Sequence, residues 1–255
     1  MGERIPMERV IERLDRCNDA GDSEGAIRLL AYWREEARSL GDERGELTVV
    51  NELMGAYRKA GDGEKAVACA EDAIALIEKQ GIGDTVSAAT IRINCATVYT
   101  AFSRAKEAIV LFEEAEAVYT RQLGNADTRL GSLYNNMATC CKETGEYARA
   151  EEAYGRALEV MSRVPGSEPE RAVTELNLAN LLEAAHGMRD ACERIEGCVQ
   201  RAHDLLEGEE VERNGHYAFV AEKCAPAFAY YGWFAYADEL KRRAAAIYAG
   251  NGDAR

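Results

Sequence analysis

The sequence predicts an all-α fold in which pairs of helices stack as repeated units, and three observations predict it. First, 47% of the 255 residues are hydrophobic but only 7% are aromatic and 4 are proline, which is typical of straight helices packed through small side chains. Second, alanine recurs at a nearly constant spacing along the chain. Third, glycine closes successive apolar runs at Gly21, Gly61 and Gly145, where a left-handed residue can end a helix.

The alanine series defines the repeat. The segment from Gly145 to Ala150 is matched by the segments from Gly61 to Ala66 and from Gly21 to Ala26, and each has alanine five residues after glycine. The full series is Ala26, Ala66, Ala108, Ala150, Ala191 and Ala237, with steps of 40, 42, 42, 41 and 46 residues. A fixed period of this size indicates stacked supersecondary units.

Each repeat is expected to contain two helices joined by a tight turn. The glycine turns fall inside the units, and stops such as Pro165-Gly166 separate one unit from the next. We expect Pro226 to kink or break the first helix of the last unit, since proline has no amide hydrogen. The prediction is one solenoid domain over residues 1–255, with units at about 7–40, 45–80, 87–122, 129–163, 170–207 and 215–249.

The fourth unit resembles the tetratricopeptide repeat (TPR) family. The resemblance is carried by Leu133-Tyr134-Asn135-Asn136-Met137-Ala138, then Gly145-Glu146-Tyr147, Ala150, Tyr154, Ala157 and Leu158. It is closest to the long repeats of about 42 residues in kinesin light chain and in bacterial scaffolds. The third unit departs by having Ser103 where the turn glycine is usual, and the fifth by shifting glycine to Gly187. The resemblance implies a right-handed α-α superhelix of about six helix pairs.

The resemblance also implies a non-enzymatic interaction module or scaffold, which binds an extended peptide or partner segment in a concave groove lined by the first helices. Asn94, Asn136 and Asn177 each stand fourteen residues before a ladder alanine. Such asparagines hold a peptide backbone in similar repeats, because a carboxamide both donates and accepts hydrogen bonds. The alternative is that they only order the stack. The candidate peptide-binding residues are Asn51, Asn94, Asn136, Asn177, Asn180, Thr97, Asn135, Thr139, Arg58 and Lys142.

Two other functions remain open from the sequence. One is a peptide-sensing regulatory protein like bacterial signalling receptors built from similar repeats. The other is a structural unit that forms a homodimer through its aromatic last repeat. The aromatic residues there can form a dimer patch or a peptide pocket, although terminal repeats are also often atypical caps. That repeat contains Tyr217, Phe219, Phe228, Tyr230, Tyr231, Trp233, Phe234, Tyr236 and Tyr248.

Several classes of function are not indicated. The formal charge of -14 disfavours nucleic acid, whose affinity depends on basic patches. We find no apolar stretch for a membrane span and no secretion signal, so a cytoplasmic protein is expected. The eight cysteines show no Cys-x-x-Cys pair, the three histidines lack helical metal-pair spacing, and no catalytic motif appears. We therefore expect no enzyme activity, no metal and no cofactor, and a protein or peptide as the partner.

Overall fold

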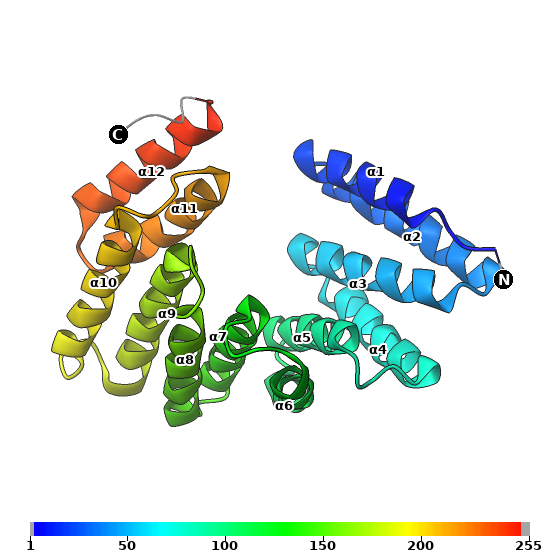
Figure 1. The fold of residues 1–255 in the computed structure, drawn as a ribbon, viewed down its shortest axis with the longest axis horizontal. Coiled ribbons are helices and arrows are strands. Elements are labelled where there is room, and N and C mark those ends of the chain that lie inside the picture. Colours follow the sequence, from blue (N-terminus) through cyan, green and yellow to red (C-terminus); the bar gives the residue numbers. More distant parts are fainter. Residues whose placement is uncertain (1–2, 251–255) are drawn as a thin grey trace. The chain divides into compact units, whose positions relative to one another are not determined.

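The computed structural model describes residues 3–250, and within that range it contains twelve α-helices and no strand (Figure 1). Consecutive helices pack as antiparallel pairs, from α1 with α2 to α11 with α12. The predicted all-α fold of about six helix pairs is confirmed. The helices are α1 (Met7–Asp19), α2 (Ser23–Leu40), α3 (Glu43–Ala60), α4 (Gly63–Gln80), α5 (Val86–Ala101), α6 (Ala105–Gln122), α7 (Thr128–Glu143), α8 (Tyr147–Met161), α9 (Glu168–His186), α10 (Cys192–Glu207), α11 (Gly215–Tyr230) and α12 (Phe234–Tyr248).

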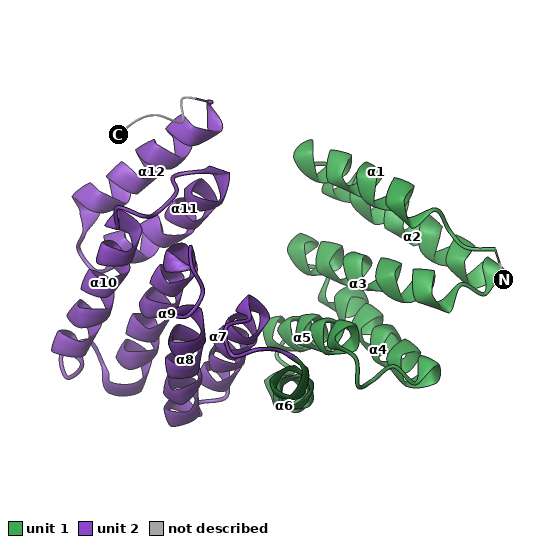
Figure 2. Ribbon diagram, in the orientation of Figure 1, with its two compact units in different colours: residues 1–122 green, residues 123–255 purple. Residues whose placement is uncertain are grey.

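The chain divides into two compact units (Figure 2). Unit 1 is Met1–Gln122 and contains α1 to α6, and unit 2 is Leu123–Arg255 and contains α7 to α12. In each unit the pairs stack on one another: α3 packs on α2 and α5 on α4 in unit 1, while α9 packs on α8 and α11 on α9 in unit 2. A single domain over residues 1–255 stays a prediction.

Glycine followed by aspartate sets the helix boundaries of unit 1. Gly41 and Gly61 close α2 and α3 at φ angles of 65° and 75°, values that residues with a Cβ atom rarely adopt. The aspartate that follows caps the next helix, because Asp42 Oδ1 accepts a hydrogen bond from the Gly45 amide at 3.0 Å and Asp62 Oδ1 from the Lys65 amide at 3.2 Å. The third repeat has Ser103 at φ 64° instead, so the turn persists at a residue that fits it less well.

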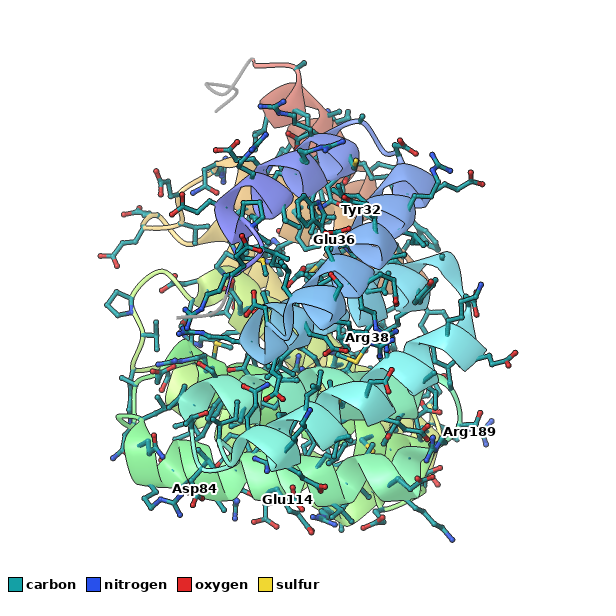
Figure 3. The ribbon with its side chains drawn as sticks, turned by 90° about the vertical axis from the view of Figure 1, so that its right-hand side faces the viewer. Tyr32, Glu36, Arg38, Asp84, Glu114 and Arg189 are labelled. Carbon is teal, nitrogen blue, oxygen red and sulfur yellow. The ribbon has the colours of Figure 1, made fainter. Side chains whose placement is uncertain are left out.

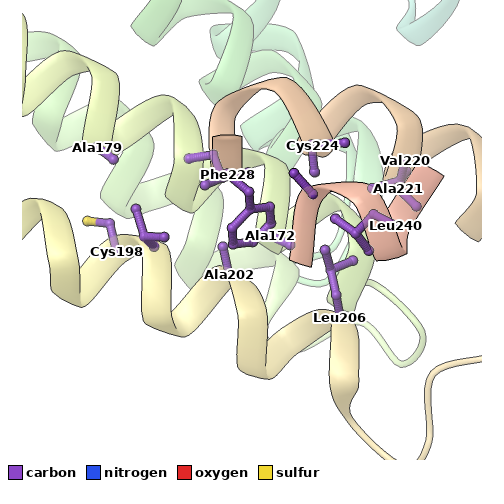
Figure 4. Packing of buried hydrophobic residues seen from close by; sticks show 14 of the residues in the cluster. Ala172, Ala179, Cys198, Ala202, Leu206, Val220, Ala221, Cys224, Phe228 and Leu240 are labelled. Atoms are coloured by element: carbon purple, nitrogen blue, oxygen red, sulfur yellow. The ribbon is translucent and has the colours of Figure 1, made fainter. Parts of the chain in front are cut away.

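The alanine ladder lies in the core. All six ladder alanines are at most 3% exposed, so any larger side chain there would force neighbouring helices apart. In unit 2 the apolar cluster joins α9 to α12, and Phe228 and Leu240 project into the space lined by Ala172, Ala202 and Leu206 (Figure 4). Small residues thus meet large ones across the helix interfaces, which gives close packing without voids.

Ion pairs connect neighbouring helices at the surface of unit 1, where charged side chains project outward (Figure 3). Arg38 Nε lies 2.5 Å from Glu46 Oε1, which joins α2 to α3. Arg121 Nη2 lies 2.9 Å from Asp84 Oδ1, in the segment just before α5. The Arg121–Asp84 pair is exposed and contributes about 0–1 kcal/mol, whereas the Arg38 guanidinium meets a Glu46 side chain that is largely buried.

Proline does not end the first helix of the last pair. Pro226 lies inside α11, and the helix runs without interruption from Gly215 to Tyr230, so the helix is not broken there and the expected kink stays a prediction. One lost hydrogen bond, to the carbonyl of Glu222, is outweighed by the packing on both sides of it.

Between residues 3 and 250 no helix is both long and apolar enough to cross a bilayer, and no group of three potential metal ligands is found there.

Candidate functional site

One register position of the first helices changes chemical character along the chain. It lies fourteen residues before each ladder alanine, and its occupants lie on α1, α3, α5, α7, α9 and α11. They change from carboxylates through amides to a lysine. The occupants are Glu12, Glu52, Asn94, Asn136, Asn177 and Lys223.

In unit 1 the amides of two neighbouring first helices bond to each other. Asn94 Nδ2 on α5 donates to Asn51 Oδ1 on α3 at 2.9 Å, and Asn51 Nδ2 donates to Glu52 Oε1 at 3.2 Å. The remaining polar atom, Asn94 Oδ1, has no partner in the described part of the chain. Asn94 is half-buried. Its carboxamide oxygen therefore stays available to accept a hydrogen bond from a ligand.

In unit 2 the same pairing of asparagines on neighbouring first helices recurs. Asn177 Nδ2 on α9 donates to Asn135 Oδ1 on α7 at 3.3 Å. In both units the acceptor is fifteen residues before its alanine and the donor is fourteen before the next one. Asn136 is half-buried, but its side chain forms no hydrogen bond with any residue between 3 and 250. The sequence did not predict this offset.

The other predicted residues divide into two kinds. The Thr97 hydroxyl donates to its own helix, to the Ile93 carbonyl at 2.8 Å, and the Thr139 hydroxyl to the Asn135 carbonyl at 3.1 Å, so both satisfy backbone first. Lys142 Nζ instead donates across the helices to Asn180 Oδ1. Arg58, the last of the predicted residues, is exposed near the end of α3 and forms no ion pair with a described residue.

A pocket of about 320 Å³ lies between α9 and α11 in unit 2. It brings Asn177 and Asn180, two predicted residues, to one wall, and it includes Tyr230 and Tyr231 from the aromatic cluster of the last repeat. It also adds residues that the sequence did not single out, such as Lys223 and Cys224. The lining consists of Val173, Leu176, Asn177, Asn180, Lys223, Cys224, Pro226, Ala227, Tyr230 and Tyr231.

Hydrogen bonds tie α9 to α11 on both sides of this pocket. Near the start of the helices, His216 Nε2 lies 2.5 Å from Glu170 Oε1. Near their ends, the hydroxyls of Tyr230 and Tyr231 donate to the Glu183 carboxylate at 2.6 and 3.3 Å. The two glutamates are thirteen residues apart, about 20 Å along a helix. The helices are therefore fixed at two points with the pocket between them.

The electrostatics give the pocket an uncharged floor and one cation at its edge. Burial raises the pKa of the Cys224 thiol to about 12, so the sulfur stays neutral and behaves as a small apolar group. Burial, followed by the Glu183 carboxylate, also raises the pKa of Tyr231, which keeps that phenol a donor. Lys223 is exposed and forms no ion pair with a described residue. The site can therefore take an apolar group and hydrogen-bond the polar atoms beside it.

A shallower hollow of about 440 Å³ lies on α1 in unit 1. It is lined by Met7 and Ile11 together with Glu8, Glu12 and Asp15. Glu12 stands in the same register as Asn177 and Lys223, so the same face of a first helix forms both hollows. The α1 hollow is acidic where the α9–α11 pocket is not.

The repeat register contained the signal that would have located the pocket. Counting fourteen residues back from Ala237 gives Lys223, the counterpart of Asn177. The predicted asparagine series ends at Asn177 because the next member is not an asparagine. The aromatic cluster of the last repeat is compatible with a cap, a dimer patch or a peptide pocket, but no sequence pattern shows that Tyr230 and Tyr231 bond to Glu183 on another helix.

The model of the tetratricopeptide repeat family matches residues 47–121 and 129–209, more than half of the chain. The chain belongs to the tetratricopeptide repeat family. The matched ranges include most of the predicted site, from Asn51 to Asn180, but end before the α11 half of the pocket. No curated protein matches the chain in sequence.

Solved structures share the fold of this tetratricopeptide repeat protein. BtubC (BKLC) from P. vanneervenii has a TM-score of 0.68 and 24% identity over 78% of this chain and 79% of that chain. A putative kinesin light chain with nearly identical TPR-like repeats from Podosopora anserina has a TM-score of 0.66 and 21% identity, over 80% and 97%. MamA from Desulfovibrio magneticus RS-1 has a TM-score of 0.55 and 18% identity, over 77% and 96%. At these identities the likeness shows the fold alone.

Tetratricopeptide repeat proteins generally serve as scaffolds for protein–protein interactions and are generally not enzymes. Membership of the family confirms the predicted relationship to long, kinesin-light-chain-like repeats. Tetratricopeptide repeat proteins bind protein partners.

Proposed function

We propose that this tetratricopeptide repeat protein is a non-enzymatic module that holds an extended segment of a partner protein on its first helices. In unit 2 an apolar side chain of that segment occupies the α9–α11 pocket. The observation that carries the proposal is the pocket itself, which has Asn177 and Asn180 on one wall and an apolar floor between two fixed helices. A cytoplasmic location fits this role and stays a prediction.

The chemistry of the pocket suits a polypeptide. An extended peptide presents backbone donors and acceptors on both sides of each side chain, and a carboxamide satisfies either kind. The floor of Val173, Leu176 and Ala227 receives the side chain, while Asn177 and Asn180 lie where its backbone passes. Because the hydrogen bonds to Glu170 and Glu183 already fix α9 against α11, little ordering is needed on binding.

Adjacent asparagines separate ligand binding from ordering of the stack. Asn135 accepts the hydrogen bond of Asn177, so Asn135→Ala is expected to lower the free energy of unfolding by about 1 kcal/mol. Asn136 bonds to no described residue, so Asn136→Ala is expected to leave stability within about 0.5 kcal/mol. If Asn136 contacts the peptide, its removal lowers affinity without lowering stability.

The test selects ligands from a random peptide library displayed on phage and measures the affinity of the selected peptides by fluorescence anisotropy. We expect Asn136→Ala, Asn177→Ala and Tyr230→Ala each to weaken binding about fivefold or more. The matched control is Gln200→Ala, which removes an exposed amide from α10 that donates to Asp204 at 2.8 Å. Failure to enrich any peptide, or equal affinity for all four variants, would reject the proposal.

A second candidate function is self-association through the last helix pair. It is favoured by the exposure of Phe219, Tyr230, Phe234 and Tyr248, which are 54–68% exposed on α11 and α12. Exposed aromatic groups of this size concentrate at protein interfaces. Sedimentation velocity over a wide concentration range tests it, and a monomer at every concentration would reject it.

A further inference from the structure

The outward face of α1 carries arginines where another first helix is apolar. Arg13 and Arg16 lie thirteen and ten residues before Ala26, and they are exposed. In α5 the same two positions are Cys95 and Val98, which are buried, and the Cys95 thiol contacts the Ala70 carbonyl of α4 at 3.6 Å. This register position is thus the one by which a first helix packs on the preceding pair.

The arginines of α1 therefore make this face unsuited to packing against another helix pair. Arg9, one turn earlier, is also exposed, and none of the three forms an ion pair with a described residue. Burying three unpaired guanidinium groups is strongly unfavourable.

The outward face of α12 has the opposite character. Phe234, Asp238, Lys241, Ala245 and Tyr248 follow helical spacing along one stripe, and all five are exposed. Their last three counterparts in α10 are Ile195, Val199 and Ala202, which are at most 2% exposed and share a cluster with α11. In α12 the stripe has an aromatic residue at each end, and no described helix covers it.

α11 extends this surface. Phe219 is 59% exposed, and Glu222, one turn further along the helix, accepts a hydrogen bond from the Tyr248 hydroxyl at 3.5 Å. That contact places the α11 residues beside the α12 stripe. We call the surface formed by Phe219, Glu222, Phe234, Asp238, Lys241, Ala245 and Tyr248 the end face.

We propose that two copies of the chain pair through their end faces about a two-fold axis. The inference rests on the self-association proposed above and adds its partner surface and symmetry. In an isologous interface each copy presents the same patch, so charges that pair across the axis must be present with both signs. The end face carries both, with Lys241 Nζ 3.6 Å from Asp238 and Glu222 beside Tyr248, in a chain whose charge of -14 otherwise repels a second copy.

The alternative is a head-to-tail contact, in which the α1 face of one copy would lie on the end face of another. Such contacts repeat without closing, which produces filaments. The end faces, in contrast, bring lysine to carboxylate and aromatic ring to aromatic ring.

Sedimentation equilibrium of the full chain tests the existence of the dimer. We expect Tyr248→Glu to raise the dimer dissociation constant roughly tenfold or more, because it adds a carboxylate beside Glu222 and removes an aromatic anchor. Tyr147→Glu, an exposed aromatic on α8 of the same unit, is the control and should leave it unchanged. Circular dichroism verifies that both variants fold. A wild-type monomer at all concentrations overturns the proposal.

Cysteine cross-linking tests the symmetry. In a background with the exposed Cys192 changed to serine, Ala245→Cys alone should form a disulfide-linked dimer, since Ala245 lies in the middle of the stripe. A cross-link that forms only when Ala245→Cys is mixed with Arg13→Cys would show a head-to-tail contact and overturn the proposal. Peptides selected by the wild type should bind the Tyr248→Glu monomer equally well, so failure of dimerisation and failure of peptide binding are distinguishable.

Discussion

Replacing Glu207 with glutamine should destabilise unit 2 measurably. Glu207 is the last residue of α10, and its carboxylate accepts hydrogen bonds from Arg243 Nη1 at 2.5 Å and from the Tyr236 hydroxyl at 2.7 Å, both on α12. Arg213, in the segment before α11, adds a third contact at 3.3 Å. One carboxylate thus connects the last three helices, and Glu207→Gln keeps its size while removing its charge.

The magnitude follows from the burial of the pair. A hydrogen bond to a charged group contributes about 1.5–3 kcal/mol. The Glu207 side chain is 25% exposed and that of Arg243 16%, and Arg243 keeps Glu239 as a second partner. We therefore take the lower end, a loss of about 1.5 kcal/mol, which corresponds to a fall in Tm of roughly 3–6 °C for a chain of this length.

The loss should depend on pH in one direction. Burial raises the pKa of Glu207, but the hydrogen bonds from Arg243 and Tyr236 outweigh it, and the net effect lowers the pKa below its ordinary value of 4.5. A carboxylate with a lowered pKa stabilises the fold above its unfolded pKa, and this contribution disappears as the pH falls through the folded pKa. The difference between wild type and Glu207→Gln should therefore be full at pH 7 and shrink below about pH 4.5.

Urea unfolding followed by tryptophan fluorescence measures this difference. The chain has two tryptophans, one in each unit, so Trp33→Phe leaves Trp233, whose ring lies 5.9 Å from that of Phe228, as a reporter of unit 2. The control is Glu210→Gln. Glu210 lies in the segment between α10 and α11, is exposed, and forms no ion pair with a described residue. A change below about 0.5 kcal/mol at pH 7, or one that persists at low pH, would refute the reasoning.

Three further changes test the turns, helix propensity and thiol burial. Ser103→Gly should raise the free energy of unfolding by roughly 1 kcal/mol, because φ is 64° there, and urea unfolding measures it. Gly155→Ala should raise it by about 0.5–1 kcal/mol, since Gly155 is exposed inside α8 and an added Cβ meets nothing within 4 Å; loss of stability would contradict this. At pH 8 a thiol reagent should modify the exposed Cys192 well before Cys224, whose pKa burial raises to about 12, as peptide mass spectrometry will show.

The fold was predictable because its determinants repeat. A buried alanine every 40 to 42 residues is required where two helices approach closely, and such a position tolerates few other residues. At positions where close packing does not require one residue type, the sequence predicted the structure less well. Ser103 still makes the turn that glycine makes elsewhere, and Pro226 remains within α11, because tertiary packing overrides a local preference of about 1 to 3 kcal/mol.

The candidate site was only half predictable. The register placed Asn177 and Asn180 on the face of α9 that lines the pocket, since helical periodicity determines which side chains point the same way. It does not determine which side chain bonds to which across a helix interface. The tyrosine contacts to Glu183 join residues 47 and 48 positions apart, and they depend on rotamers and on the exact approach of α9 to α11, neither of which has a sequence period.

The paired asparagines make ordering of the stack and binding of a peptide compatible roles. The amide nitrogen of Asn94 donates a hydrogen bond to Asn51, and this bond fixes the direction of the free oxygen of Asn94. A ligand that donates to this oxygen therefore need not order the Asn94 side chain, and no entropy of that side chain is lost on binding. Asn136 has no such bond, so a ligand must order its side chain but can use both donor and acceptor. Under the peptide binding proposed above, the repeats would contact the ligand in two ways: through a fixed acceptor at Asn94 and through an adaptable donor and acceptor at Asn136. The difference arises from a neighbour in the preceding helix pair rather than from the residue type.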